Sequence, residues 1–319
     1  MAEDGETHVM ILFTRSLSIL LGMVAMCAPA RSDAADVFRV ATYNLENYLE
    51  ARIGTRPAKS VAGKAKILEG LRMVNAEVLA LQEMGNTNAL FELRESLRAE
   101  GLHYPFWEHV TGSDTNIHVA VLSKFPIVAR HPHTNDSFLL FGRRFRVSRG
   151  FAEVDIQVGP SYRFTLITAH LKSRRPVPDA DEAELREQEA LLLREKIDAR
   201  LLAKPNLNLI VLGDFNDSKD APSTRALLGR GKSALIDTRP AEQNGDDQPD
   251  GRLRSAARTV TWTYYYGKED TYSRIDYILL SSGMAREWNQ AESYVLALPN
   301  WGVASDHRPL VATFSTADK

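Results

Sequence analysis

The 319-residue sequence predicts one large domain that contains both β-strands and α-helices. Short apolar runs, typical of buried strands, alternate along the chain with stretches that have helical spacing. The composition is ordinary for a soluble globular protein, with 44% hydrophobic and 25% charged residues. No internal repeat and no clear linker divides the sequence. These three observations favour one α/β or β-sandwich domain over two small ones.

The first 35 residues are predicted to be an N-terminal extension with a signal peptide, and residues 36–319 the mature domain. Arg15 precedes an apolar run over residues 17–28 and then small residues, which is the pattern of a secretory signal peptide. The run is too short for a comfortable membrane span, and an N-terminal helix of the domain is the alternative. Cleavage after Ala30 or after Ala35 fits the pattern. The protein is therefore predicted to be periplasmic or secreted. Because the only cysteine, Cys27, lies in this segment, the mature protein is expected to have no disulfide and no cysteine-ligated metal.

The expected strands are apolar runs or alternating segments, and the expected helices carry apolar residues three and four positions apart. Residues 241–252 are polar and acidic and contain Gly and Pro, which predicts an exposed loop. The expected strands are 37–43, 78–82, 117–122, 151–158, 162–169, 209–212, 259–266, 273–280 and 310–314. The expected helices are 64–74, 89–98 and 181–202.

The stretch over residues 208–216 predicts a catalytic edge. Residues 209–212 are continuously apolar, which suits a strand buried on both faces. Gly213 ends the run and permits a close backbone approach. Asp214 and Asn216 follow two residues apart, so both side chains point to the same side of an extended chain. An Asx-rich turn is the structural alternative.

Other strands also end in, or contain, polar residues. A carboxylate inside an apolar strand is costly to bury without a partner, and Asp276 between Ile275 and Tyr277 is the clearest case. If these residues converge, they form an acidic pocket with two histidines, which suits a hard divalent cation such as Mg²⁺, Mn²⁺ or Ca²⁺. The set comprises Asn44, Glu83, His170, Asp214, Asn216, Asp276, Asp306 and His307.

Six short motifs in this order resemble the endonuclease/exonuclease/phosphatase superfamily, which includes DNase I, exonuclease III-type repair nucleases, neutral sphingomyelinases and inositol polyphosphate 5-phosphatases. The motifs are Thr42-Tyr-Asn44-Leu, Leu81-Gln-Glu83, Thr168-Ala-His170-Leu, Gly213-Asp214-Phe-Asn216, Arg274-Ile-Asp276-Tyr and Ser305-Asp306-His307-Arg-Pro. The resemblance spans residues 37–314. It implies a DNase I-like four-layer α/β sandwich, with two packed mixed β-sheets flanked by helices.

The resemblance also implies roles for these residues. Glu83 is the expected main metal ligand, with Asn44 and Asp306 beside it. Asp276 and His307 are expected to form a dyad, and Asp214 and Asn216 to position the attacking water and the phosphoryl oxygens. His170 is expected to protonate the leaving oxygen, and Arg149 to contact a phosphate. His170 is a feature of the DNase I-like and sphingomyelinase-like branches and argues against an exonuclease III-type enzyme.

We therefore expect an exported, metal-dependent phosphodiesterase, and a nuclease in particular. The formal net charge of -2 gives no bulk attraction to nucleic acid, so a local patch of Arg143, Arg144, Arg146 and Arg149 would have to bind the backbone. A sphingomyelinase-like phospholipid phosphodiesterase is the alternative. It would need an exposed apolar hairpin, for which residues 138–141 are the nearest candidate, although such residues are more often core. A non-catalytic binding protein on the same fold is a third interpretation, and no stable protein partner is implied.

Overall fold

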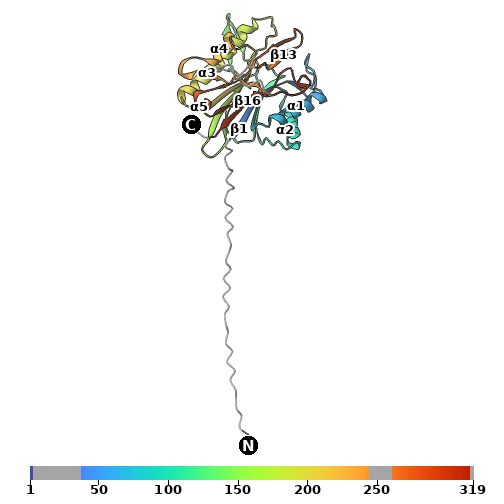
Figure 1. Ribbon diagram of the computed structural model, residues 1–319, viewed down its shortest axis with the longest axis vertical. Coiled ribbons are helices and arrows are strands. Elements are labelled where there is room, and N and C mark those ends of the chain that lie inside the picture. The colour runs from blue at the N-terminus through green and yellow to red at the C-terminus, as the bar shows by residue number, and fades with distance from the viewer. Residues whose placement is uncertain (3–36, 244–260, 317–319) are drawn as a thin grey trace, which may run out of the picture. The chain divides into compact units, whose positions relative to one another are not determined.

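The computed structural model of the protein describes residues 1–2, 37–243 and 261–316 (Figure 1). The expected signal peptide, with Cys27, Ala30 and Ala35, lies outside the described residues. So do residues 244–252 of the expected loop and residues 259–260 of the expected aromatic strand. Within the described ranges, no helix is both long enough and apolar enough to cross a membrane.

Two mixed β-sheets form the centre of the domain. The seven-stranded sheet has the order β12 (Ala241–Glu242), β16 (Trp288–Val295), β17 (Leu310–Ser315), β1 (Val37–Tyr48), β2 (Val78–Met84), β4 (His118–Ser123) and β3 (Phe106–Val110). The six-stranded sheet has the order β11 (Ile236–Asp237), β15 (Asp276–Leu280), β10 (Leu209–Asp214), β9 (Arg163–His170), β8 (Phe151–Gln157) and β5 (Ile127–Arg130). In each sheet a central strand has one parallel and one antiparallel neighbour, β1 between β2 and β17 and β10 between β9 and β15.

Helices cover the outer face of each sheet. The seven-stranded sheet packs against α1 (Val61–Val74) and α2 (Thr87–Ala99), and the six-stranded sheet packs against α3 (Glu182–Ala203) and α4 (Pro222–Leu228). Figure 1 shows the two helix pairs on opposite sides of the strands. Short helical segments, α5 (Ser282–Ala285), η1 (Gly231–Ser233) and η2 (Trp301–Val303), complete the set. This arrangement confirms the four-layer α/β sandwich.

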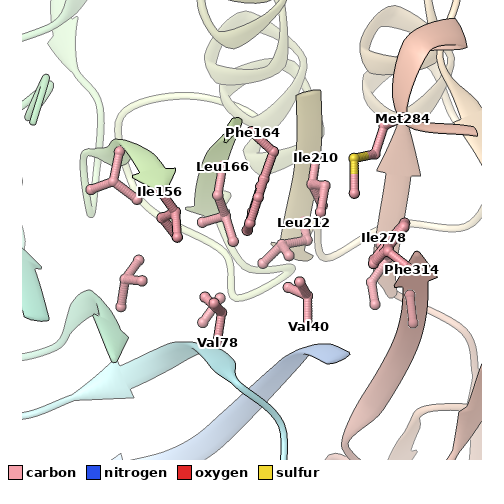
Figure 2. Close-up of a cluster of buried hydrophobic side chains, with 14 of the residues drawn as sticks. Val40, Val78, Ile156, Phe164, Leu166, Ile210, Leu212, Ile278, Met284 and Phe314 are labelled. Atoms are coloured by element: carbon pink, nitrogen blue, oxygen red, sulfur yellow. The ribbon is translucent and has the colours of Figure 1, made fainter. Parts of the chain in front are cut away.

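Apolar side chains fill the space between the two sheets. Val40 and Val78 of the first sheet face Leu166, Ile210 and Leu212 of the second sheet (Figure 2). The alternate residues of β10, Leu209 and Val211, pack on the other side in the layer that contains α3. The apolar run of β10 is therefore buried on both faces, as expected, and each such side chain contributes about 2 kcal/mol by its burial.

Two β-hairpins stand outside the large sheets, and the sequence analysis described both incompletely. The expected strand over 273–280 is split, because β14 (Thr271–Ser273) pairs with β13 (Tyr264–Tyr266) whereas β15 pairs with β10. The basic stretch contains β7 (Arg143–Arg146), which pairs with β6 (Ser137–Leu140). Phe138 of this second hairpin is buried, but Leu139 and Phe141 are 61% and 77% exposed, so two residues of the apolar hairpin candidate over 138–141 face solvent.

Candidate active site

The register of the six-stranded sheet places three predicted site residues side by side. Asp214, the last residue of β10, lies opposite His170 of β9 and opposite Asp276 of β15. All three side chains are buried, with at most 2% of their surface exposed. The buried apolar run of β10 thus ends in a carboxylate. At the same end of the sheet, the neighbouring strands β9 and β15 carry an imidazole and a second carboxylate.

The seven-stranded sheet adds Asn44 from β1. Its amide Nδ2 donates a hydrogen bond of 2.9 Å to Oδ2 of Asp214, which links the two sheets at the site. The Ser305 hydroxyl donates to the carbonyl oxygen of Asn44 at 2.7 Å and accepts the backbone N–H of His307 at 3.0 Å. These bonds fix the 305–307 segment, and with it the second histidine, against the end of β1.

Asp276 and His307 form a hydrogen-bonded dyad. Nδ1 of His307 lies 2.8 Å from Oδ2 of Asp276, and because an ionised carboxylate only accepts, Nδ1 carries the proton and Nε2 faces Asp214 at 3.7 Å. Burial alone would lower the pKa of His307, but the carboxylates of Asp276 and Asp214 outweigh it and hold that pKa well above its usual value. Thr263 also donates to Oδ2 of Asp276, at 2.7 Å.

Asp214 is the centre of the cluster. Its Oδ1 accepts the backbone N–H of Asn216 at 2.9 Å, and its Oδ2 lies 3.4 Å from Nε2 of His170. Burial and the nearby charge of Asp276 raise the pKa of Asp214 to about 7, although His307 acts in the opposite direction. The carboxylates of Asp214 and Asp276, together with His307, offer ligand atoms within 4.8 Å of one another, so this buried cluster could hold a metal ion.

His170 is buried and neutral. Burial, and next the positive charges of Arg149 and His307, hold the pKa of His170 well below its ordinary value. Nδ1 of this ring has no hydrogen-bond partner among the described residues. The ring therefore reaches the reaction centre through Nε2, beside Asp214, and any catalytic role must use a neutral imidazole.

The backbone at the site adopts conformations that most residues avoid. Glu83 at the end of β2 and Asn216 after β10 both have φ of 56°, in the left-handed region. Gly213 has φ of 136°, and a Cβ there would collide with the carbonyl oxygen of Ala169 on β9. Strain of this kind is concentrated at functional sites, because it aims side chains where a regular strand would not.

A second acidic group lies at the end of the seven-stranded sheet. The Glu83 carboxylate accepts the backbone N–H of Asn47 at 2.9 Å. Burial, followed by the like charges of Glu46 and Glu83, raises the pKa of Asp306 to about 6, with His307 opposing. Glu83 and Asp306, two of the predicted metal ligands, are therefore close enough to repel each other. The third, Asn44, is joined to this group through Asp214 and Ser305.

The arginines of the predicted patch separate into two groups. Arg149 is buried at the site, where its Nη1 donates to the carbonyl oxygen of Leu171 at 3.1 Å, and the amide of Asn216 donates to the same oxygen at 3.0 Å. Nε of Arg149 has no hydrogen-bond partner in the described part of the chain. Arg143, Arg144 and Arg146 lie instead on the exposed strand β7.

Residues without a recognisable sequence signal complete the site. Thr263 anchors Asp276, and Nε of Arg174 donates to the carbonyl oxygen of Asn216 at 3.1 Å. Tyr264 lies with its ring centroid 4.7 Å from that of His307. Thr263 and Tyr264 fall within the strand expected over residues 259–266, but none of these three residues was predicted to belong to the site.

A DNase I-like sandwich with a buried Asp–His dyad at the strand ends is the architecture of a phosphoester hydrolase. The profile of the "Endonuclease/Exonuclease/phosphatase family" matches residues 41–307, which include every residue of the site, and this chain belongs to that family. Its members hydrolyse phosphoester bonds.

Solved structures share the fold at low sequence identity. The human Nocturnin catalytic domain with bound sulfate anion is 17% identical, covers 88% of this chain and 94% of its own, and has a TM-score of 0.60. Truncated TDP2 from Caenorhabditis elegans is 14% identical (88% and 97% covered, TM-score 0.55), and sphingomyelinase C from Streptomyces griseocarneus is 18% identical (88% and 100% covered, TM-score 0.54). No curated protein matches the sequence.

Proposed function

We propose that this chain is an exported, divalent-metal-dependent phosphodiesterase that hydrolyses nucleic acid. The observation that carries the proposal is the Asp276–His307 dyad, which faces Asp214 at the joined ends of the two sheets. At neutral pH its raised pKa makes His307 an imidazolium, suited to binding a phosphoryl oxygen. Asp214 and Asn216 lie where they can orient the attacking water for in-line displacement.

The expected cation is Mg²⁺, with Mn²⁺ or Ca²⁺ as alternatives. Glu83, Asn44 and Asp306 provide oxygen ligands. Burial, and in smaller part the like charges of Glu46 and Glu83, raise the pKa of Asp306, which supports a cation next to these carboxylates. When bound, such a cation neutralises charge on the phosphodiester. His170, with Nε2 directed at the centre, is proposed to stabilise the leaving oxygen by a hydrogen bond from its neutral imidazole, while water supplies the proton.

Nucleic acid is favoured because positive and aromatic groups border the site. Arg149 lies beside Asn216, and its Nε makes no hydrogen bond within the described residues but lies 3.8 Å from the carboxylate of Asp114. The half-exposed Arg174 donates to the backbone of Asn216 and lies 3.5 Å from the carboxylate of Asp217. Guanidinium groups in this position suit a phosphate backbone. Tyr264 adds an aromatic ring next to His307.

A metal-dependence assay tests the proposal. Purified protein is incubated with plasmid DNA, sphingomyelin vesicles or bis-p-nitrophenyl phosphate, with and without Mg²⁺ or Mn²⁺, and His307→Ala serves as the control. DNA cleavage that requires the cation and disappears in the variant supports the nuclease. Inactivity on all three substrates would contradict the proposal and favour a narrower phosphate ester or a binding role.

One observation favours a phospholipid phosphodiesterase as the second candidate. The β6–β7 hairpin presents Leu139 and Phe141 to solvent, and Arg144 and Arg146 of its second strand hydrogen-bond to Ser137 and Asn135 rather than to an acid. Apolar side chains flanked by arginine suit a lipid–water interface. Phe141 has φ of 50° in a turn where Asn or Gly is preferred. Hydrolysis of sphingomyelin vesicles without DNA cleavage would support this candidate. A sphingomyelinase C is among the structures that share the fold.

Export is proposed from the signal-peptide pattern. Cleavage after Ala30 would leave Arg31 as the first residue, and cleavage after Ala35 would leave Asp36. N-terminal sequencing of the protein recovered from the periplasm or medium distinguishes these sites. Recovery of the full-length chain from the cytoplasm alone would contradict export.

A further inference from the structure

The β13 strand is attached to the catalytic segment. Tyr264 forms an antiparallel bridge with His307, and the backbone N–H of Tyr265 donates to the carbonyl oxygen of Asp306 at 2.9 Å. The backbone N–H of Arg308 donates to the carbonyl oxygen of Thr263 at 2.8 Å. The side chains of β13 therefore have fixed positions relative to the dyad. Figure 1 labels this strand.

One face of β13 continues the catalytic histidine as a row of rings. Tyr264 and Tyr266 are alternate residues of the strand, so they share a face. The ring centroid of Tyr264 lies 4.7 Å from that of His307 and 6.4 Å from that of Tyr266, and the two tyrosine rings are inclined by only 24°. Both tyrosines are partly exposed. The His307 ring is inclined by 41° to that of Tyr264, so the two tyrosine rings form a nearly parallel pair next to the dyad.

The opposite face of the hairpin holds this row in place. The ring of Tyr265 packs on that of Tyr272 of β14, with 4.8 Å between the ring centroids. The ring of Tyr272 packs on that of Trp262, with 4.9 Å between the centroids. Trp262 in turn contacts Trp301 at 5.1 Å and lies under the guanidinium of Arg308 at 4.3 Å. An aromatic cluster of this size accounts for the position of Tyr265, but it does not use Tyr264 or Tyr266.

Charged groups border the row at its inner end. Burial, and then the carboxylates of Asp306 and Asp214, raise the pKa of Tyr264, while the nearby Arg174 opposes them. Arg174 is half exposed and bonded to the carbonyl oxygen of Asn216. A positive group, the dyad and two tyrosine rings therefore share one side of the site.

We infer that Tyr264 and Tyr266 form a stacking platform for a nucleobase next to the scissile phosphate, so that the substrate is a nucleotide phosphodiester with an unpaired or flexible end. The inference rests on the proposed phosphodiesterase function. Every base has a planar face, and stacking on aromatic side chains is a general mode of binding single strands. A quaternary ammonium headgroup prefers a cage of rings that surround it, and the low inclination of these two rings is less suited to that geometry.

Four p-nitrophenyl phosphodiesters with the same leaving group test the platform. They carry thymidine (as the 5′ and the 3′ ester), a methyl group or choline on the retained side. The measured quantity is the ratio of kcat/KM for the thymidine ester to that for the methyl ester. We expect the wild type to prefer thymidine, Tyr266→Ala to reduce that ratio about 5- to 150-fold, and Tyr266→Phe to retain it.

Tyr265→Ala is the matched control, because it removes the same side chain from the same strand on the opposite face. It is expected to lower both rates in proportion and leave the ratio unchanged. A Tyr266→Ala protein with the wild-type ratio would overturn the inference, as would a ratio of one in the wild type or a preference for the choline ester. A wild-type protein inactive on all the esters in the presence of Mg²⁺ and Mn²⁺ would instead contradict the proposed function itself.

Discussion

Asp276→Asn is the substitution that tests the dyad most directly. The amide keeps the shape of the side chain in β15 but removes the charge that holds Nδ1 of His307 at 2.8 Å. Without that charge, the lowering of the His307 pKa by burial is opposed less strongly. The pKa of His307 therefore falls, and less imidazolium is present at neutral pH. One preorganised donor to a charged transition-state oxygen contributes about 10²–10³-fold to kcat. We therefore expect kcat to fall about 10³-fold, which is about 4 kcal/mol of transition-state stabilisation, with a smaller change in KM.

The pH profile gives the sign of the effect. If imidazolium binds the phosphoryl oxygen, activity is present below the pKa of His307 and is lost as the pH rises through it. In Asp276→Asn this alkaline loss should move to lower pH. The assay is Mg²⁺-dependent hydrolysis of bis-p-nitrophenyl phosphate between pH 5 and 10 at matched ionic strength.

A matched control separates chemistry from stability. Asp237→Asn removes the carboxylate charge that pairs with Arg274 at 2.7 Å. Neither residue is among the groups that shift the pKa of His307, so this variant should lower the melting temperature without moving the alkaline limb. A folded Asp276→Asn protein with activity within about threefold of the wild type would refute the reasoning, as would an unmoved alkaline limb.

Three further predictions concern single residues. Gly213→Ala should destabilise the fold by about 3 kcal/mol in denaturant titration, because its Cβ would collide with the carbonyl of strand β9; an unchanged midpoint would contradict this. Burial alone would raise the pKa of Glu153, but hydrogen bonds from His133 and Arg200 lower it, so its stabilisation is present above the unfolded-state pKa and is lost as the pH falls through the folded-state value. Glu153→Gln should therefore be about 1–3 kcal/mol less stable at pH 7, and melting curves should show the deficit shrinking below about pH 4 rather than persisting. His170→Asn should slow release of an alkoxide by about 10²-fold or more but slow release of p-nitrophenolate much less, since only the more basic alkoxide needs the hydrogen bond from Nε2; equal losses would assign His170 a structural role.

The strands of the core could be predicted because their apolar runs carry a local signal. Residues 209–212 and 78–82 needed no knowledge of their neighbours to be identified as buried strands, and β10 and β2 contain them. The helix over 181–202 was predicted almost to the residue, because Asp181 caps it by accepting the N–H groups of Ala183 and Glu184. Periodicity and capping chemistry are local, so one sequence suffices for them.

The arrangement of the site was not a local property. The pairing of Asp214 with both His170 and Asp276 depends on the register of three strands from distant parts of the sequence. Only the resemblance of the motifs indicated that these residues converge. The support from Thr263 was not predicted, because a threonine before a tyrosine run carries no signal until the hairpin brings it to Asp276.

The β6–β7 hairpin shows how a composition rule fails. Its four apolar residues were the nearest candidate for an exposed hairpin, although such runs are more often buried. In the structure only alternate side chains face inward, so Phe138 stacks on Phe145 across the hairpin while Leu139 points to solvent. The turn at Phe141 and Gly142 lacks the Asn-Gly signal that would have revealed a hairpin.

The site concentrates negative charge where the fold disfavours it most. Asp214 and Asp276 are almost fully buried on adjacent strands, and the raised pKa of Asp214, about 7, reflects that cost. The positive charge of His307 between them offsets part of it, and Asn44 and Thr263 provide hydrogen bonds for the rest. A hydrophobic replacement would relieve the repulsion, since buried ion clusters contribute little net stability. The gathering of the whole set at the strand ends is therefore explained by chemistry on a phosphate ester and not by folding.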